Sequence, residues 1–103
     1  MAIVAFITKT PTSEFVIGLD FTTELPDGVT LSTGVASARN RKTEEDVTGV
    51  LLSDTDVTVD AAANTGKVAI QGGEMGVWYE VLFQMTLSNG HTLPGKYVIF
   101  VDL

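Results

Sequence analysis

The feature that most constrains the fold of this chain is the alternation of side chains along residues 77–88. Every odd-numbered position there is apolar, whereas the even-numbered positions mix polar and apolar residues. Because side chains alternate between the two faces of a β-strand, the pattern predicts a long strand with one fully apolar face. We expect Tyr79 to point into a core and Trp78 to point outward. The apolar positions are Val77, Tyr79, Val81, Phe83, Met85 and Leu87.

The composition extends this prediction to the whole chain. Its 103 residues include thirteen Val, five Ile and fourteen Thr, whose β-branched side chains fit a pleated sheet better than a helix. Alanine, leucine, glutamate and lysine do not accumulate at helical spacing for more than about one turn. These observations predict an all-β fold.

Further strands are predicted where apolar residues alternate or cluster between turn-forming residues. Residues 29–38 are expected to place Val29, Leu31, Thr33 and Val35 on one side. Asn89-Gly90 predicts a type I′ hairpin turn, residues 61–66 a loop, and Pro94-Gly95 an interruption of the returning strand. The predicted strands are residues 1–7, 14–21, 29–38, 47–52, 56–60, 67–71, 77–88 and 97–101.

About seven or eight short strands with turn signals between them are typical of a sandwich or small barrel. We predict a single domain, residues 1–103, that folds as an immunoglobulin-like antiparallel β-sandwich. Because the chain has no cysteine, its core must rest on aliphatic and aromatic packing. The expected contributors to that core are Phe15, Leu19, Phe21, Tyr79, Val81 and Phe83.

Charge and residue types argue against several classes of function. Thirteen acidic residues against six basic ones give a net charge of −7, which argues against a nucleic-acid partner. The absence of cysteine excludes a disulfide scaffold and a thiolate metal site. The apolar start is too short for a transmembrane helix and has no basic residue before it, so we expect no membrane partner and synthesis in the cytosol.

Three features imitate chemical sites. Asp54, Asp56 and Asp60 resemble calcium ligands but lack the register of a calcium-binding loop, and aspartate is also a common turn residue. The glycine-rich residues 72–76 run into a strand and lack the Lys-Ser/Thr of a phosphate-binding loop. His91 follows a turn, where nothing would orient it as a base. We therefore predict no catalytic residue, no cofactor, no metal and no enzyme activity.

Two other features indicate protein contacts. Residues 39–46 contain three basic residues followed at once by three acidic ones, which predicts either a solvated loop or a dipolar latch that guides a neighbouring subunit. Trp78 and Leu82 share the outward face of their strand, where Trp78 is expected to be covered either by a loop or by a partner, and tryptophan is enriched at binding hot spots. The candidate protein-interaction residues are Trp78, Leu82, Arg39, Arg41, Lys42, Glu44 and Glu45.

Several short motifs carry a family resemblance. They are Phe6-Ile7-Thr8-Lys9-Thr10-Pro11, Leu19-Asp20-Phe21, Gly28-Val29-Thr30-Leu31, Gly72-Gly73, Gly76, Tyr79 and Gly90. This set resembles small tail-, neck- or head-associated proteins of tailed bacteriophages and prophages. The resemblance implies an immunoglobulin-like structural protein of the virion, made in the bacterial host cytoplasm, which docks to other virion proteins or to copies of itself. The alternative is a carbohydrate- or receptor-binding module of a surface adhesin.

Overall fold

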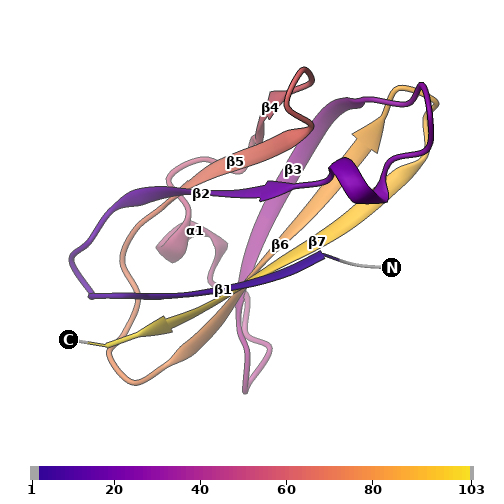
Figure 1. Cartoon of the computed structure of the whole chain (residues 1–103). Coiled ribbons are helices and arrows are strands. Elements are labelled where there is room, and N and C mark those ends of the chain that lie inside the picture. Colours follow the sequence, from indigo (N-terminus) through magenta and orange to yellow (C-terminus); the bar gives the residue numbers. More distant parts are fainter. Residues whose placement is uncertain (1–2, 103) are drawn as a thin grey trace.

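The computed structural model describes residues 3–102 as two β-sheets packed face to face (Figure 1). Positions 1 and 2 of the first predicted strand lie outside this range. Two short helices, η1 (Thr22–Glu24) and α1 (Thr48–Leu51), lie in the connections. The strands are β1 (Ile3–Lys9), β2 (Phe15–Asp20), β3 (Leu31–Asn40), β4 (Thr58–Asp60), β5 (Thr65–Ile70), β6 (Trp78–Leu87) and β7 (Thr92–Val101).

The strand order confirms the predicted fold class. One sheet has four strands in the order β1-β7-β6-β3, and the other has three in the order β2-β5-β4. The β7-β6-β3 and β2-β5-β4 neighbours follow the arrangement of immunoglobulin-like sandwiches. One detail of the prediction is wrong, because β1 runs parallel to β7, with Ile3 beside Gly95 and Lys9 beside Val101. The other strand pairs are antiparallel.

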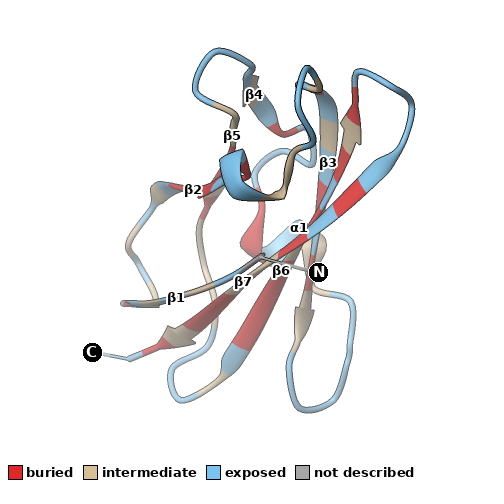
Figure 2. Cartoon of the chain, turned by 45° about the vertical axis from the view of Figure 1, so that its right-hand side comes forward, coloured by how far each residue is buried: buried red, intermediate tan, exposed pale blue. Residues whose placement is uncertain are grey.

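The core lies between the sheets and takes buried side chains from both of them, with the largest share from β6 (Figure 2). Tyr79 is buried as predicted, and its hydroxyl accepts a hydrogen bond of 2.9 Å from the backbone N–H of Glu74. This contact matches the tyrosine corner of immunoglobulin-like domains, in which such a residue ties its strand to the preceding loop. Of the other expected core residues, Phe15 is half-buried and the rest are buried: Leu19, Phe21, Val81 and Phe83.

The predicted face of β3 is wrong because the strand contains a bulge. Pairing with β6 shifts between Leu31 and Thr33, which moves the following residues to the opposite faces. Leu31 is therefore buried while Val35 is exposed, and Ala36 faces the core in its place.

Residues 47–52 were expected to form a strand, but Thr48–Leu51 form the helical turn α1. The backbone of Ala38 on β3 forms two hydrogen bonds to this segment. Its N–H donates to Thr48 Oγ1 at 3.0 Å, and its carbonyl accepts from Val47 N–H at 2.9 Å. Leu51 is fully buried. The segment therefore covers the outer edge of β3 with a turn instead of adding a strand to it.

The β6–β7 hairpin also differs from the prediction. Gly90 has a φ of 86°, but Asn89 is not in the positive-φ region, so the turn is not type I′. Gly90 N–H donates to the Leu87 carbonyl at 2.9 Å, and Leu87 N–H donates to the His91 carbonyl at 2.8 Å. These bonds close a three-residue loop that ends in glycine, a common alternative to the two-residue turn.

Strand β7 is not interrupted at Pro94-Gly95. A Cβ atom at Gly95 would lie 2.7 Å from Leu19 Cδ1 and 3.0 Å from Phe21 Cζ. Glycine is therefore placed there because the side chains of Leu19 on β2 and Phe21 just beyond it pack directly against the backbone of β7. Neither helix in the described chain approaches the length of apolar helix that a membrane crossing requires.

Candidate protein-interaction surface

The outer face of the four-stranded sheet carries most of the predicted interaction residues. Trp78, Glu80 and Leu82 alternate outward along β6, and strand register sets their neighbours. Phe100 lies opposite Trp78, and Lys96 lies opposite Leu82. The neighbours of Glu80 are Val98 on β7 and Arg39 on β3.

Glu80 is the centre of this face and is only 4 % exposed, although it points away from the core. Arg39 Nε donates to Glu80 Oε1 at 2.8 Å. Lys96 Nζ lies 3.2 Å from Glu80 Oε2, and Arg41 Nε lies 3.7 Å from the same oxygen. One buried carboxylate therefore holds three cations from β3, its following loop and β7.

Two opposing effects set the pKa of Glu80. Burial raises the pKa of the carboxyl, while the hydrogen bonds and charges of Arg39 and Lys96 lower it. The charged partners prevail, so the pKa of Glu80 lies below its usual value. The carboxylate stays ionised at neutral pH and keeps the cations in place.

Aromatic side chains lie at one end of this charge cluster. The Trp78 and Phe100 rings are 4.7 Å apart between centroids and tilted by 35°. The Arg41 guanidinium lies 5.8 Å from the centroid of the Trp78 ring, within cation–π range. Trp78 is 44 % exposed. The predicted outward position of Trp78 is therefore confirmed.

A hollow of about 420 Å³ adjoins the cluster on its other side. It is formed by β3, β6 and β7, with Val35, Leu82 and Pro94 among its lining residues. We call the whole region the β6 surface, and it comprises Val35, Arg39, Arg41, Trp78, Glu80, Leu82, Lys96 and Phe100.

The β6 surface includes four of the residues singled out from the sequence: Arg39, Arg41, Trp78 and Leu82. Of the remaining three, Glu44 approaches Arg39, with 3.8 Å between Oε1 and Nη1. Lys42 and Glu45 lie in the exposed loop beyond β3. The loop predicted at 39–46 therefore begins two residues later than predicted, because Arg39 and Asn40 belong to β3.

The loop folds back on itself. Asn40 Oδ1 accepts hydrogen bonds from Lys42 N–H at 2.9 Å and from Thr43 N–H at 3.2 Å. Arg41 N–H donates to the Trp78 carbonyl at 2.9 Å. These bonds hold the base of the loop against the start of β6, so Arg41 is positioned beside Trp78.

Sequence reasoning missed four members of this surface. Val35 was assigned to the same face as Leu31, and the bulge in β3 reverses that face. The other three are Glu80 and Phe100, which lie within predicted strands, and Lys96, which directly precedes one. Their proximity depends on the β6–β7 register, which the sequence does not display.

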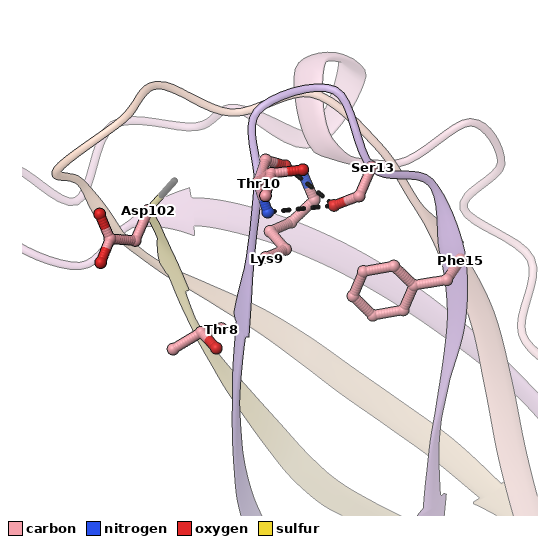
Figure 3. Close-up of a pocket in the computed structure, with 6 residues that line it drawn as sticks. All are labelled: Thr8, Lys9, Thr10, Ser13, Phe15 and Asp102. Atoms are coloured by element: carbon pink, nitrogen blue, oxygen red, sulfur yellow. Dashed lines mark hydrogen bonds between the residues drawn. The ribbon is translucent and has the colours of Figure 1, made fainter.

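A second hollow, of about 390 Å³, lies between β1 and β2 beside Lys9 (Figure 3). Lys9 is buried, and its ammonium donates hydrogen bonds to the carbonyls of Thr10, at 2.6 Å, and Gly72. Burial lowers the pKa of Lys9 below its usual value, although the charge of Glu14 acts in the opposite direction. These contacts give Lys9 a structural part, since they tie the end of β1 to the glycine-rich residues 72–76.

The other features singled out from the sequence form local turns. Asp54 Oδ1 accepts from Asp56 N–H at 2.9 Å, and Asp60 Oδ1 accepts from Ala62 N–H at 3.1 Å. Backbone N–H of His91 donates to Asn89 Oδ1 at 3.0 Å, and the residue is exposed. Within residues 3–102, no group of three or more His, Asp or Glu side chains gathers closely enough to hold a metal ion.

Comparison with known proteins assigns the chain to no family: it matches no protein-family model and no curated protein sequence. A function for the β6 surface must therefore be inferred from the chemistry of the surface itself.

Proposed function

We propose that this chain is a non-enzymatic assembly module that docks onto another protein through the β6 surface. The observation that carries the proposal is the exposed Trp78 ring beside cations ordered by a buried carboxylate. Tryptophan and arginine are the residues most enriched at the energetic centres of protein interfaces. A preformed ion cluster also lowers the entropy cost of ordering those side chains on binding.

The charge of the surface indicates the partner. Arg39, Arg41 and Lys96 outnumber Glu80, so this face carries excess positive charge in a chain whose net charge is −7. A positively charged face on a negatively charged chain favours a partner with an acidic surface and orients the encounter. The partner we propose is therefore an acidic face of a protein.

The setting we propose is the virion of a tailed bacteriophage or prophage, with synthesis in the bacterial host cytoplasm. The support for it is the resemblance of the short motifs described above to tail-, neck- or head-associated proteins. The acidic composition is compatible with that role, because such a chain would stay soluble and be repelled by the packaged genome.

A glycan-binding adhesin module is the competing proposal. An exposed tryptophan on a sheet face is able to stack on a sugar ring. Here, however, Phe100 already contacts the Trp78 ring and Arg41 lies over it. Less of the ring remains for a sugar, which favours a protein partner.

The test uses particles from the host strain that encodes the chain. Particles assembled without its gene are incubated with purified chain, and the bound copies are counted by quantitative mass spectrometry. We expect the unmodified chain to bind in a fixed ratio to the major structural proteins. The double variant Trp78→Ala/Arg41→Ala should bind at least about tenfold more weakly, because it removes the aromatic and cationic centre.

Val50→Ala is the matched control, since Val50 is 54 % exposed and lies outside the β6 surface. It should bind as the unmodified chain does. Absence of the chain from wild-type particles would refute the virion setting. Binding of the unmodified chain to a glycan array, with loss in Trp78→Ala, would favour the adhesin proposal instead.

A further inference from the structure

Strand β1 forms one edge of the four-stranded sheet. This strand pairs with β7 on one side, and no described strand pairs with it on the other. Its outward side chains include Phe6, which is 66 % exposed, and Val4, which is 49 % exposed. An apolar strand at the edge of a sheet is a template for pairing with another strand.

The direction of the backbone groups on β1 follows from one hydrogen bond. The Lys9 carbonyl accepts from Asp102 N–H at 2.8 Å, so the polar groups of Lys9 point toward β7. Backbone direction alternates along a strand, which means that Ile7 and Ala5 also point toward β7. The N–H and C=O groups of Val4, Phe6 and Thr8 therefore point to the open edge.

The other sheet edges of the described chain are protected. The edge of β3 is bonded by the segment that follows it: Ala36 N–H donates to the Thr55 carbonyl at 2.8 Å, and Val57 N–H donates to the Gly34 carbonyl at 3.0 Å. Strand β4 has only three residues.

Strand β2 carries two deterrents to pairing at its edge, Gly18 and Asp20. Strand β1 has neither proline nor glycine, and its one charged residue, Lys9, is buried. It therefore lacks the devices that usually prevent edge pairing.

We propose that the open edge of β1 binds β1 of a second copy of this chain, antiparallel across a two-fold axis at Phe6. The inference rests on the proposed function, since it supplies the contact by which copies of the module associate. The two four-stranded sheets would join into one continuous sheet. Phe6 would face Phe6 of the second copy, and Val4 would face Thr8.

Two observations favour a second copy as the occupant. First, a register centred on Phe6 pairs the full length of Ile3–Lys9 with itself, so the edge is self-complementary. Val4, Phe6 and Thr8 of both copies would then exchange about six hydrogen bonds. Second, residues 3–8 carry no charge, so two chains of net charge −7 can approach there without opposing carboxylates.

The test begins with sedimentation equilibrium of the full chain over a range of concentrations, where we expect a monomer–dimer equilibrium. Phe6→Lys and Phe6→Glu should each weaken the dimer by about tenfold or more, because each places like charges face to face. A mixture of the two variants should restore the dimer as a heterodimer, detected by native mass spectrometry. Val16→Lys, at an exposed position of β2, is the control and should dimerise normally.

A proline pair tests the hydrogen bonds separately from the side chains. Phe6→Pro removes an N–H from the open edge, so it should abolish the dimer with little loss of melting temperature. Ile7→Pro removes an N–H directed at β7, so it should lower the melting temperature strongly. Equal loss of melting temperature in both variants would contradict the assigned backbone direction.

The outcomes separate this inference from the proposed function. The chain could prove strictly monomeric and still bind, through Trp78 and Arg41, to particles assembled without its gene (depleted particles). That result overturns the β1 dimer and leaves the docking proposal standing. A dimer that the Phe6 variants do not weaken, or that their mixture does not restore, also overturns the inference. If the dimer behaves as expected but the chain is absent from wild-type particles, the inference is supported and the virion setting is refuted.

Discussion

Lys9 and Glu80 are the two buried charged side chains of the described chain, each 4 % exposed, and they are stabilised in different ways. Lys9 is the last residue of β1, and its ammonium bonds to the backbone carbonyls of Thr10 and Gly72. Glu80 lies on the outer face of a sheet and is surrounded by cationic side chains.

The difference in bonding partners gives the two buried charges different roles. A lysine bonded to carbonyls fixes the positions of two backbone segments and presents nothing to a partner. A carboxylate bonded to three cations that are partly exposed orders groups that a partner can contact. The buried charge at Lys9 therefore belongs to the fold, whereas that at Glu80 organises the β6 surface.

The largest expected effect follows from reversing the charge of Glu80. Glu80→Lys would place a fourth cation among Arg39, Arg41 and Lys96, in a site from which water is largely excluded. Leaving buried charge uncompensated costs about 3–5 kcal/mol, so the free energy of unfolding should fall by about that amount. Urea unfolding monitored by tryptophan fluorescence measures it.

Glu74→Lys is the control for this reversal, because Glu74 is exposed in a loop and its change should stay within about 0.5 kcal/mol. A Glu80→Lys variant as stable as this control would show that the ion cluster is not formed in solution. The contrast between Lys9 and Glu80 would then lose its basis.

A smaller effect is expected at Lys9. Lys9→Met keeps the length of the side chain but leaves the Thr10 and Gly72 carbonyls without their donor, which should cost about 1–3 kcal/mol. The variant should bind depleted particles normally, because Lys9 is not on the β6 surface. Impaired binding with unchanged stability would contradict a purely structural part for this residue.

The pH dependence of the same variant gives a second measurement. Burial places the pKa of Lys9 below its usual value of 10.5, so the unfolded chain binds more protons than the folded one between the two values. The stability of the unmodified chain relative to Lys9→Met should therefore rise as the pH increases through this window. Melting temperatures of the two proteins above neutral pH test the sign.

The sequence pattern predicted the strands better than it predicted the site. Alternation was sufficient for β2 and β6, because each has one continuous apolar face. It failed for β3, where a bulge after Leu31 reverses the faces, since a bulge arises from pairing with another strand. It also failed for residues 47–52, where contacts with β3 favour a turn over an extended strand.

The charge cluster shows why the site was found only in part. Arg39, Glu80 and Lys96 lie on three different strands, and only register brings them together. Trp78 and Leu82 were identified because they occupy the same face of a single strand. Features within one strand are visible in the sequence, whereas features between strands require the fold.

A still smaller change in stability is expected when the pH is lowered. The cationic partners hold the pKa of Glu80 below its usual value of 4.5, so the stability that this adds is fully present above 4.5. It is lost as the pH falls through the folded-state pKa. The stability of the unmodified chain relative to Glu80→Gln should therefore shrink below pH 4.5. A difference in melting temperature that stays constant down to strongly acidic pH would contradict the charge-based account of Glu80.

The smallest effect on stability, and the sharpest separation of fold from surface, is expected at Arg41. Its Nε lies 3.7 Å from Glu80 Oε2 and its side chain is 47 % exposed, so water can replace the ion pair. Arg41→Ala should change the free energy of unfolding by less than about 1 kcal/mol, as exposed ion pairs usually do. Binding to depleted particles should nevertheless weaken, because the cation beside Trp78 is gone, and the binding that remains should depend less on salt concentration. Unfolding curves and binding at two ionic strengths measure the two quantities, and a loss of stability without a loss of binding would place Arg41 with Lys9 instead of with the surface around Glu80.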